Sequence, residues 1–153
     1  GQRPGQHGAL VAAGADPLEL HQLLYNTYEP KRLQFFGRAL SERLKVLPEL
    51  NTAYFAIPKS DMDEYGMQKS DTEGLVNYTL SIKGMRLGVL MVEYPEQIKM
   101  SFRSIGDVPA NAMARHFEGG GHFNAAGARS TRSLSETETE LLNLLQDYTE
   151  VLR

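Results

Sequence analysis

The sequence contains no cysteine, so neither a disulfide nor a thiolate metal site is available to this chain. It also lacks an excess of positive charge, since 16 lysine and arginine residues stand against 19 aspartate and glutamate residues, a formal net charge of −3. The molecule as a whole therefore offers no basic field to duplex DNA or to an anionic membrane. Any anion that it binds must be held locally. The lack of disulfides fits a reducing compartment, and we expect a cytoplasmic protein.

No apolar run approaches the roughly 18–20 residues that cross a bilayer, and we expect no membrane partner. The opening stretch, GQRPGQHGAL, lacks the apolar region of a secretory signal and has no initiator methionine. The chain therefore looks like an excised piece of a longer protein. We expect residues 1–8, which are polar and rich in glycine and glutamine, to be poorly ordered or foreign to the fold.

Helical periodicity dominates both ends of the chain. Residues 9–48 are expected to be a helical linker region, because apolar side chains recur at helical spacing from residue 31 to the proline at 48. The basic side chains of that helix, Arg38 and Arg43 among them, are expected to be solvated. Near the other end, SETE at 135–138 is typical of a capping box and predicts a final helix.

The middle of the chain has β character. NTAYFAIP at 51–58 predicts a strand, and two further runs between residues 85 and 104 predict an antiparallel hairpin. The segment 71–84 is ambiguous and could hold a helix to about Leu80. We therefore predict an α/β fold of mixed α+β type, in which a central mixed β-sheet is flanked by helices. Residues 49–153 are expected to form this domain, after the linker helices.

A glycine-rich motif, EGGGHFNAAGA at 118–128, is the most unusual feature of the sequence. Without a Cβ, main-chain N–H groups at Gly119, Gly120 and Gly121 could converge on a small anion. The spacing matches neither the dinucleotide-binding fingerprint nor the P-loop. One interpretation is an anion site in which His122 donates a hydrogen bond or carries a proton. The alternative is a helix C-cap at Gly119 followed by a turn.

A second candidate for anion binding lies on the predicted hairpin. Arg103 alternates with buried positions and faces solvent, where its guanidinium can form two hydrogen bonds with a phosphate. The other histidines of the chain, at 7, 21 and 116, are interpreted as structural or surface residues. Asp61 and Asp63 are interpreted as an acidic helix start rather than a metal site. These residue types indicate a phosphate site without defining its reaction.

The motif GGGHFNAAGA, preceded by Arg-Ser at 103–104 and by Asn111, resembles the C-terminal DHHA1 domain of DHH-family phosphoesterases. The resemblance runs from about Ala9 to the end of the chain. The stretches NTYEPKRLQFFGRAL and EGLVNYTLSIKG are most similar to the nanoRNase/pAp phosphatase branch, which also takes in RecJ-like and exopolyphosphatase-related proteins. In this family a DHH domain holds a manganese pair, and the DHHA1 domain closes over it and grips the substrate.

The resemblance also implies roles for individual residues. The glycines at 119–121 and His122 would line the cleft between the two domains, with His122 in an auxiliary catalytic role. Arg103 and Ser104 would contact a substrate phosphate. Asn111 would support the site or touch the substrate, and Asn77 is a weaker candidate through its place in EGLVN. The family resemblance further suggests a homodimer.

The D-H-H tripeptide and the other metal ligands of the family are absent from this sequence. We therefore expect no cofactor in this chain and Mn²⁺ in a DHH domain that lies outside it. The resemblance implies binding of a short oligoribonucleotide or a pAp-like nucleotide, without hydrolysis by this chain alone. The alternatives are a tRNA-contacting C-terminal domain like that of alanyl-tRNA synthetase, or a cyclic dinucleotide phosphodiesterase domain. A purely structural dimerisation domain would leave the glycine motif unexplained.

Overall fold

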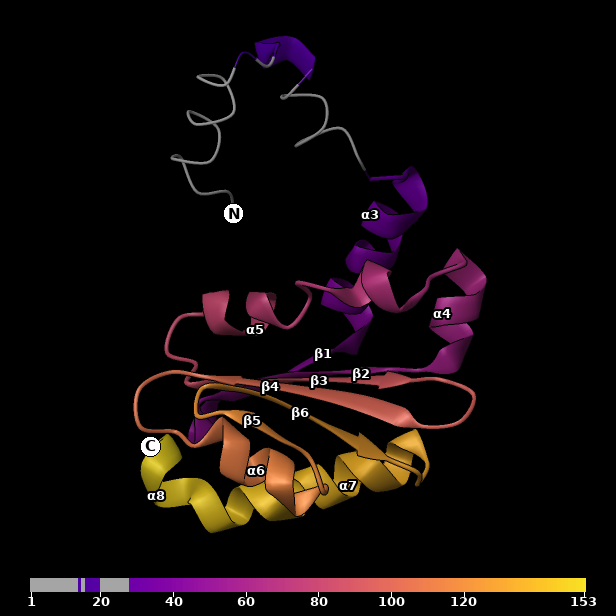
Figure 1. Ribbon diagram of the computed structural model, residues 1–153. Coiled ribbons are helices and arrows are strands. Elements are labelled where there is room, and N and C mark those ends of the chain that lie inside the picture. The colour runs from indigo at the N-terminus through magenta and orange to yellow at the C-terminus, as the bar shows by residue number, and fades with distance from the viewer. Residues whose placement is uncertain (1–13, 15, 20–27) are drawn as a thin grey trace.

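The computed structural model describes residue 14, residues 16–19 and residues 28–153. The expectations for residues 1–8, for His7 and His21, and for most of the helical pattern before residue 28 lie outside the described residues. The described part of the chain forms a central sheet between two layers of helices (Figure 1). The predicted mixed sheet flanked by helices is therefore confirmed.

The sheet has six strands in the order β1-β2-β3-β4-β6-β5. Strands β2 and β3 are parallel, and all other neighbouring pairs are antiparallel. The predicted strand at 51–58 and the predicted hairpin are confirmed as β2 and as β3 with β4. The strands are β1 (Leu44–Leu47), β2 (Thr52–Ile57), β3 (Leu87–Glu93), β4 (Ile98–Ser104), β5 (Gly120–His122) and β6 (Ala125–Ser130).

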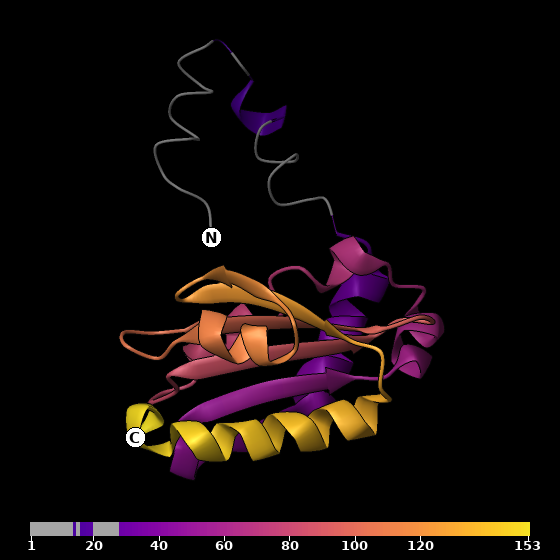
Figure 2. The same ribbon diagram turned by 60° about the horizontal axis from the view of Figure 1, so that its bottom comes forward.

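Helices lie on both faces of the sheet (Figures 1 and 2). One face carries α3 (Pro30–Arg38), the π-helical η1 (Ala39–Arg43), α4 (Lys59–Tyr65), η3 (Lys69–Thr72) and α5 (Asn77–Ser81). The other carries α6 (Ala110–His116), α7 (Leu134–Leu145), η4 (Gln146–Tyr148) and α8 (Thr149–Leu152). A short 3-10 turn, η2 (Pro48–Leu50), joins β1 to β2. None of the helices in the described part of the chain is both long and apolar enough to cross a membrane.

Each face of the sheet has its own apolar core. Phe102, Met113 and Leu141 belong to the core beneath α6 and α7, and each is fully buried. Phe35 and Phe55 belong to the core beneath α3, α4 and α5, and they too are fully buried. Burial of a large apolar side chain contributes roughly 1.5–3 kcal/mol, so these two clusters hold the three layers together.

The helices on the α3–α5 face cover only half of the sheet. Every residue of β2 is buried, as is almost every residue of β3, because both strands have helices above and below. In contrast, β4 and β6 alternate between buried and solvent-facing positions, and β5 is exposed throughout. Three adjacent strands therefore present one bare face to solvent, which is the face predicted for Arg103.

The helix predicted over residues 31–47 is correct only as far as Arg43. Leu44–Leu47 instead form β1, which pairs with β2 through a turn in which Asn51 takes a left-handed φ of 44°. The apolar spacing of residues 31–47 predicts a buried Leu33, but Leu33 is 59% exposed and Phe35 is buried instead. Antiparallel pairing with the sheet therefore outweighs the helical spacing of the leucines. The region expected to be a helical linker contributes an edge strand.

Two basic side chains that were expected to be solvated are engaged in an ion-pair cluster. Arg43 donates from Nε to Oδ2 of Asp61 at 2.7 Å, and Arg38 contacts Oδ1 of the same carboxylate at 3.4 Å. Asp61 is only 2% exposed, so its charge requires these partners. The cluster ties α3 and η1 to α4. The carboxylate is thus structural, as predicted, although it is more deeply buried than a helix start requires.

Two helix starts also differ from the predictions. The ambiguous segment 71–84 forms the end of η3 and then α5, because Gly74 with a φ of 84° interrupts any continuous helix. The capping box before α7 uses Ser133 and Glu136 rather than SETE at 135–138. The Ser133 hydroxyl accepts from the Glu136 N–H at 3.1 Å, and Glu136 accepts from the Ser133 N–H at 3.3 Å.

We predict that Ser133→Ala lowers the free energy of unfolding by about 1 kcal/mol, because it removes the N-cap of α7. Ser135→Ala is the matched control, since Ser135 is exposed inside the helix and does not cap it. Urea unfolding of both variants gives the comparison. A loss of stability in Ser135→Ala alone would show that the cap lies where the sequence pattern placed it.

Candidate phosphate-binding site

The bare half of the sheet brings Arg103 and His122 together. Ala125 on β6 is the cross-strand partner of Arg103 on β4 and also of His122 on β5. Adjacent strands are about 4.8 Å apart, so the backbones of Arg103 and His122 lie about 10 Å apart with one methyl group between them. Because side chains directly across a sheet point to the same face, both reach the space above Ala125.

A second row beside the first has almost no side chains. Ser101, Gly127 and Gly120 are partners across β4, β6 and β5. A Cβ at Gly120 would meet no atom within 4 Å, and one at Gly127 would touch only the carbonyl oxygen of Met100, at 3.4 Å. The main chain at Gly120 and Gly127 is therefore open to a ligand, on the face of the sheet that Ser101 shares.

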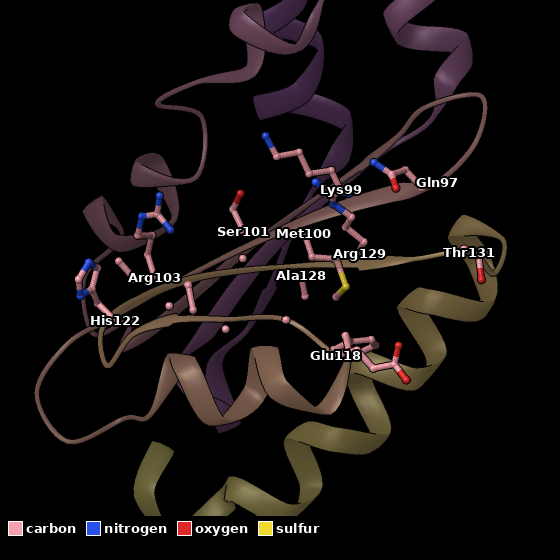
Figure 3. Close-up of a pocket in the computed structure, with 17 residues that line it drawn as sticks. Gln97, Lys99, Met100, Ser101, Arg103, Glu118, His122, Ala128, Arg129 and Thr131 are labelled. Carbon is pink, nitrogen blue, oxygen red and sulfur yellow. The ribbon is translucent and has the colours of Figure 1, made fainter.

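These rows line a cleft of about 940 Å³, shown in Figure 3. Arg103 and His122 lie near one end of it, and Lys99 on β4 and Arg129 on β6 lie farther along the sheet. Glu118 is the one carboxylate among the lining residues. Lys99, Arg103 and Arg129 form no ion pair with any residue that the structure describes. The cleft is thus locally basic in a chain of net negative charge.

Gly119 and Gly121 are required by the fold itself. A Cβ at Gly119 would lie 2.1 Å from the carbonyl oxygen of Gly127, inside the neighbouring strand. Gly121 has a φ of 147°, and its Cβ would lie 2.8 Å from the carbonyl oxygen of Ala125. The left-handed C-cap predicted at Gly119 is wrong, because Glu118 takes that conformation with a φ of 60°. Of the three glycines, only Gly120 has open space in front of it.

Ser104 does not reach the cleft. It is buried on the opposite face of β4 from Arg103, where its hydroxyl donates to the carbonyl oxygen of Val108 at 2.6 Å. Asn124, in the turn between β5 and β6, donates to the Ser104 hydroxyl at 2.9 Å and to the Gly106 carbonyl at 3.1 Å. Ser104 and Asn124 thus fasten the β5–β6 hairpin to the end of β4, which sets the position of His122.

The two predicted asparagines lie in different places. Asn111 is half-buried on α6, and its N–H donates to the carbonyl oxygen of Phe123 in the same hairpin at 3.4 Å. It is therefore in a supporting position and does not line the cleft. Asn77 begins α5 and lines a separate hollow with Tyr28 and Arg32, so the structure does not bring it to the glycine loop.

Sequence reasoning missed several residues of the site. Lys99 and Ser101 follow from the alternation of β4, which the hairpin pattern already contained. Arg129 could be assigned only from the register of β6, and Asn124 only from the turn, where asparagine is common. His116, in contrast, contacts Glu140 at the protein surface, as expected of a surface residue.

No group of three or more His, Cys, Asp or Glu side chains within residues 28–153 and the few described before them is placed to hold a metal ion. The described residues therefore do not supply the ligands that a manganese pair would need. Arg103, His122 and the exposed main chain can bind and orient an anion.

The fold and the basic cleft agree with a family assignment. Residues 50–151 match the model of the DHHA1 domain, and the chain belongs to this family. It is 38% identical over 98 residues to the bifunctional oligoribonuclease and PAP phosphatase NrnA of Bacillus subtilis (strain 168), an alignment that spans 64% of this chain and 31% of that protein. The predicted relation to the nanoRNase/pAp phosphatase branch of DHH phosphoesterases is confirmed.

Solved structures share the fold. An exopolyphosphatase-related protein from Bacteroides fragilis superposes with a TM-score of 0.84 at 35% identity, over 94% of this chain and 42% of that one. A pGpG-specific phosphodiesterase, PggH of Vibrio cholerae, matches with a TM-score of 0.59 at 15% identity, over 91% of this chain and 49% of that one. The chain thus spans less than half the length of each of these relatives.

We predict that the three glycines differ sharply in their response to alanine. Gly119→Ala and Gly121→Ala should each lower the free energy of unfolding by about 1–3 kcal/mol, through a backbone clash and through positive-φ strain respectively. Gly120→Ala should change it by less than about 0.5 kcal/mol, because its Cβ meets open space. Chemical denaturation of the three variants measures this. Equal destabilisation by all three would contradict the assigned roles.

Proposed function

We propose that this chain is the substrate-binding domain of a DHH-type phosphoesterase and that its cleft binds a phosphate of a short oligoribonucleotide or a pAp-like nucleotide. The observation that carries the proposal is the row formed by Arg103, Ala125 and His122. Among the described residues, it places a guanidinium without a carboxylate partner opposite an imidazole, with only a methyl group between them.

The chemistry of the row suits a phosphate oxyanion. One guanidinium nitrogen of Arg103 donates to the Phe102 carbonyl oxygen at 2.9 Å, which fixes the side chain and leaves its other donors for a ligand. An arginine fork matches two phosphate oxygens. His122 can donate a hydrogen bond to a third oxygen or supply a proton. Gly120, in the adjacent row, allows the ligand to approach the main chain beside this position.

The names of the relatives support a nucleotide substrate. The Bacillus subtilis relative is an oligoribonuclease and PAP phosphatase, which favours a short nucleotide over transfer RNA as the ligand of this chain. We propose that hydrolysis needs a DHH domain that lies outside this chain. A manganese pair there would activate the attacking water, and the cleft of this chain would hold and orient the substrate phosphate.

We predict that Arg103→Ala weakens the binding of pAp to this chain by about tenfold to hundredfold, the usual loss for a hydrogen bond to a charged group. Arg103→Lys should recover only part of the affinity, because an ammonium cannot form the paired hydrogen bonds. Arg115→Ala, at an exposed arginine on α6, is the control. Calorimetric titration measures all four proteins. Unchanged affinity in Arg103→Ala would remove this residue from the site.

We also predict that the chain alone does not hydrolyse pAp in the presence of Mn²⁺, because it lacks the metal-binding residues of the DHH domain. Phosphate release measured on the purified chain tests this. The Arg103→Ala variant serves as the control for a contaminating nuclease, which that substitution would leave unaffected. Turnover that disappears in Arg103→Ala would show that the chain is catalytic by itself and would refute this division of roles.

A further inference from the structure

A pair of like charges lies farther along the bare face of the sheet. Lys99 on β4 and Arg129 on β6 are direct cross-strand partners, and both are exposed. Like charges placed directly opposite each other on a sheet are destabilising. Neither side chain forms an ion pair with a residue in the described part of the chain. Within that part, the fold therefore holds two positive charges together without a protein anion to neutralise them.

This pair lies on the same face of the sheet as the proposed phosphate site. Every second residue of β4 points to this face, namely Lys99, Ser101 and Arg103. Each of them has a cross-strand partner on β6 and so belongs to a separate row. Residues two apart on a strand are separated by about 6.7 Å. Lys99 therefore lies about 13 Å from Arg103 along β4. Figure 3 shows Lys99, on the same strand as Arg103, next to Arg129 of the neighbouring strand β6, with both well removed from Arg103.

A second hollow adjoins the cleft along β4. This hollow, of about 210 Å³, shares Lys99, Ser101 and Arg103 with the larger cleft. It lies toward the segment that joins α4 to α5, from which Lys69 adds another positive charge and Glu73 the one carboxylate among its lining residues. Two basic side chains, Lys99 and Arg103, thus line both spaces, with the neutral Ser101 between them on β4.

We propose that Lys99 and Arg129 form a binding position for an additional substrate phosphate, which makes the domain selective for oligonucleotides with three phosphates over pAp. This inference rests on the proposed function. The first phosphate lies in the row of Arg103 and His122, the second in the row of Ser101 and Gly120, and the third between Lys99 and Arg129. Because pAp carries phosphates at only two positions, it does not reach the third row.

The experiment compares two ligands on the chain, pAp and the 5′-phosphorylated trinucleotide pApApA, by calorimetric titration over a range of KCl concentrations. The variants are Lys99→Gln, Arg129→Gln and the double substitution, with Lys83→Gln at an exposed lysine as the control. We expect the double variant to bind pApApA about tenfold more weakly and pAp with unchanged affinity. Its plot of log affinity against log salt concentration for pApApA should be shallower by about 0.7 for each phosphate that the variant no longer neutralises.

Thermal unfolding without ligand gives an independent reading, since relief of the repulsion should leave the variants at least as stable as the wild-type chain. If the double variant binds pApApA as tightly as wild type while pAp binding still depends on Arg103, the third position is refuted and the proposed function stands. If the wild-type chain binds neither ligand, or if Arg103→Ala binds both as tightly as wild type, the proposed function fails. This inference then fails with it.

Discussion

The close packing of β5 against β6 is the constraint on which the site depends. Because Gly119 and Gly121 have no side chains, the edge strand lies directly against the backbone of β6, where a Cβ at Gly119 would be 2.1 Å from a carbonyl oxygen. That approach sets the register in which His122 and Arg103 share Ala125 as a partner. The hydrogen bonds of Asn124 then fix the hairpin to the end of β4. Folding therefore requires Gly119 and Gly121, whereas Gly120 is left open for the ligand that we propose.

The uneven covering of the sheet explains how an acidic protein holds a basic cleft. Helices α3, α4 and α5 bury β2 and β3 on one face, and they leave β4, β6 and β5 open. Charged side chains can stand on this open face at little desolvation cost, whereas burial would require partners such as those that surround Asp61. The negative charge of the molecule lies elsewhere, and the field above the three bare strands is local.

The sequence predicted the sheet, the hairpin and the principal motif because these features are encoded by neighbouring residues. Alternation along β4 was sufficient to turn Arg103 toward solvent, and the family resemblance placed His122 beside it. The separate roles of Gly119, Gly120 and Gly121 could not be predicted, since they depend on which backbone atoms of β6 approach each glycine. The pairing of Lys99 with Arg129 likewise requires the strand register. The leucines at 44 and 47 follow a helical spacing although pairing with β2 determines their structure. Ser104 faces away from the cleft because neighbouring residues of a strand point to opposite faces of the sheet.

The central claim is that a substrate phosphate lies between Arg103 and His122 above Ala125. Nuclear magnetic resonance tests it most directly, by titration of the isotopically labelled chain with pAp. The account predicts that the largest amide shift changes occur at Gly120, His122 and Ala125, accompanied by a change at the Arg103 side-chain Nε–H. Shift changes concentrated around Asn77 and Arg32, in the hollow beside α5, would contradict it, as would a spectrum that pAp leaves unchanged.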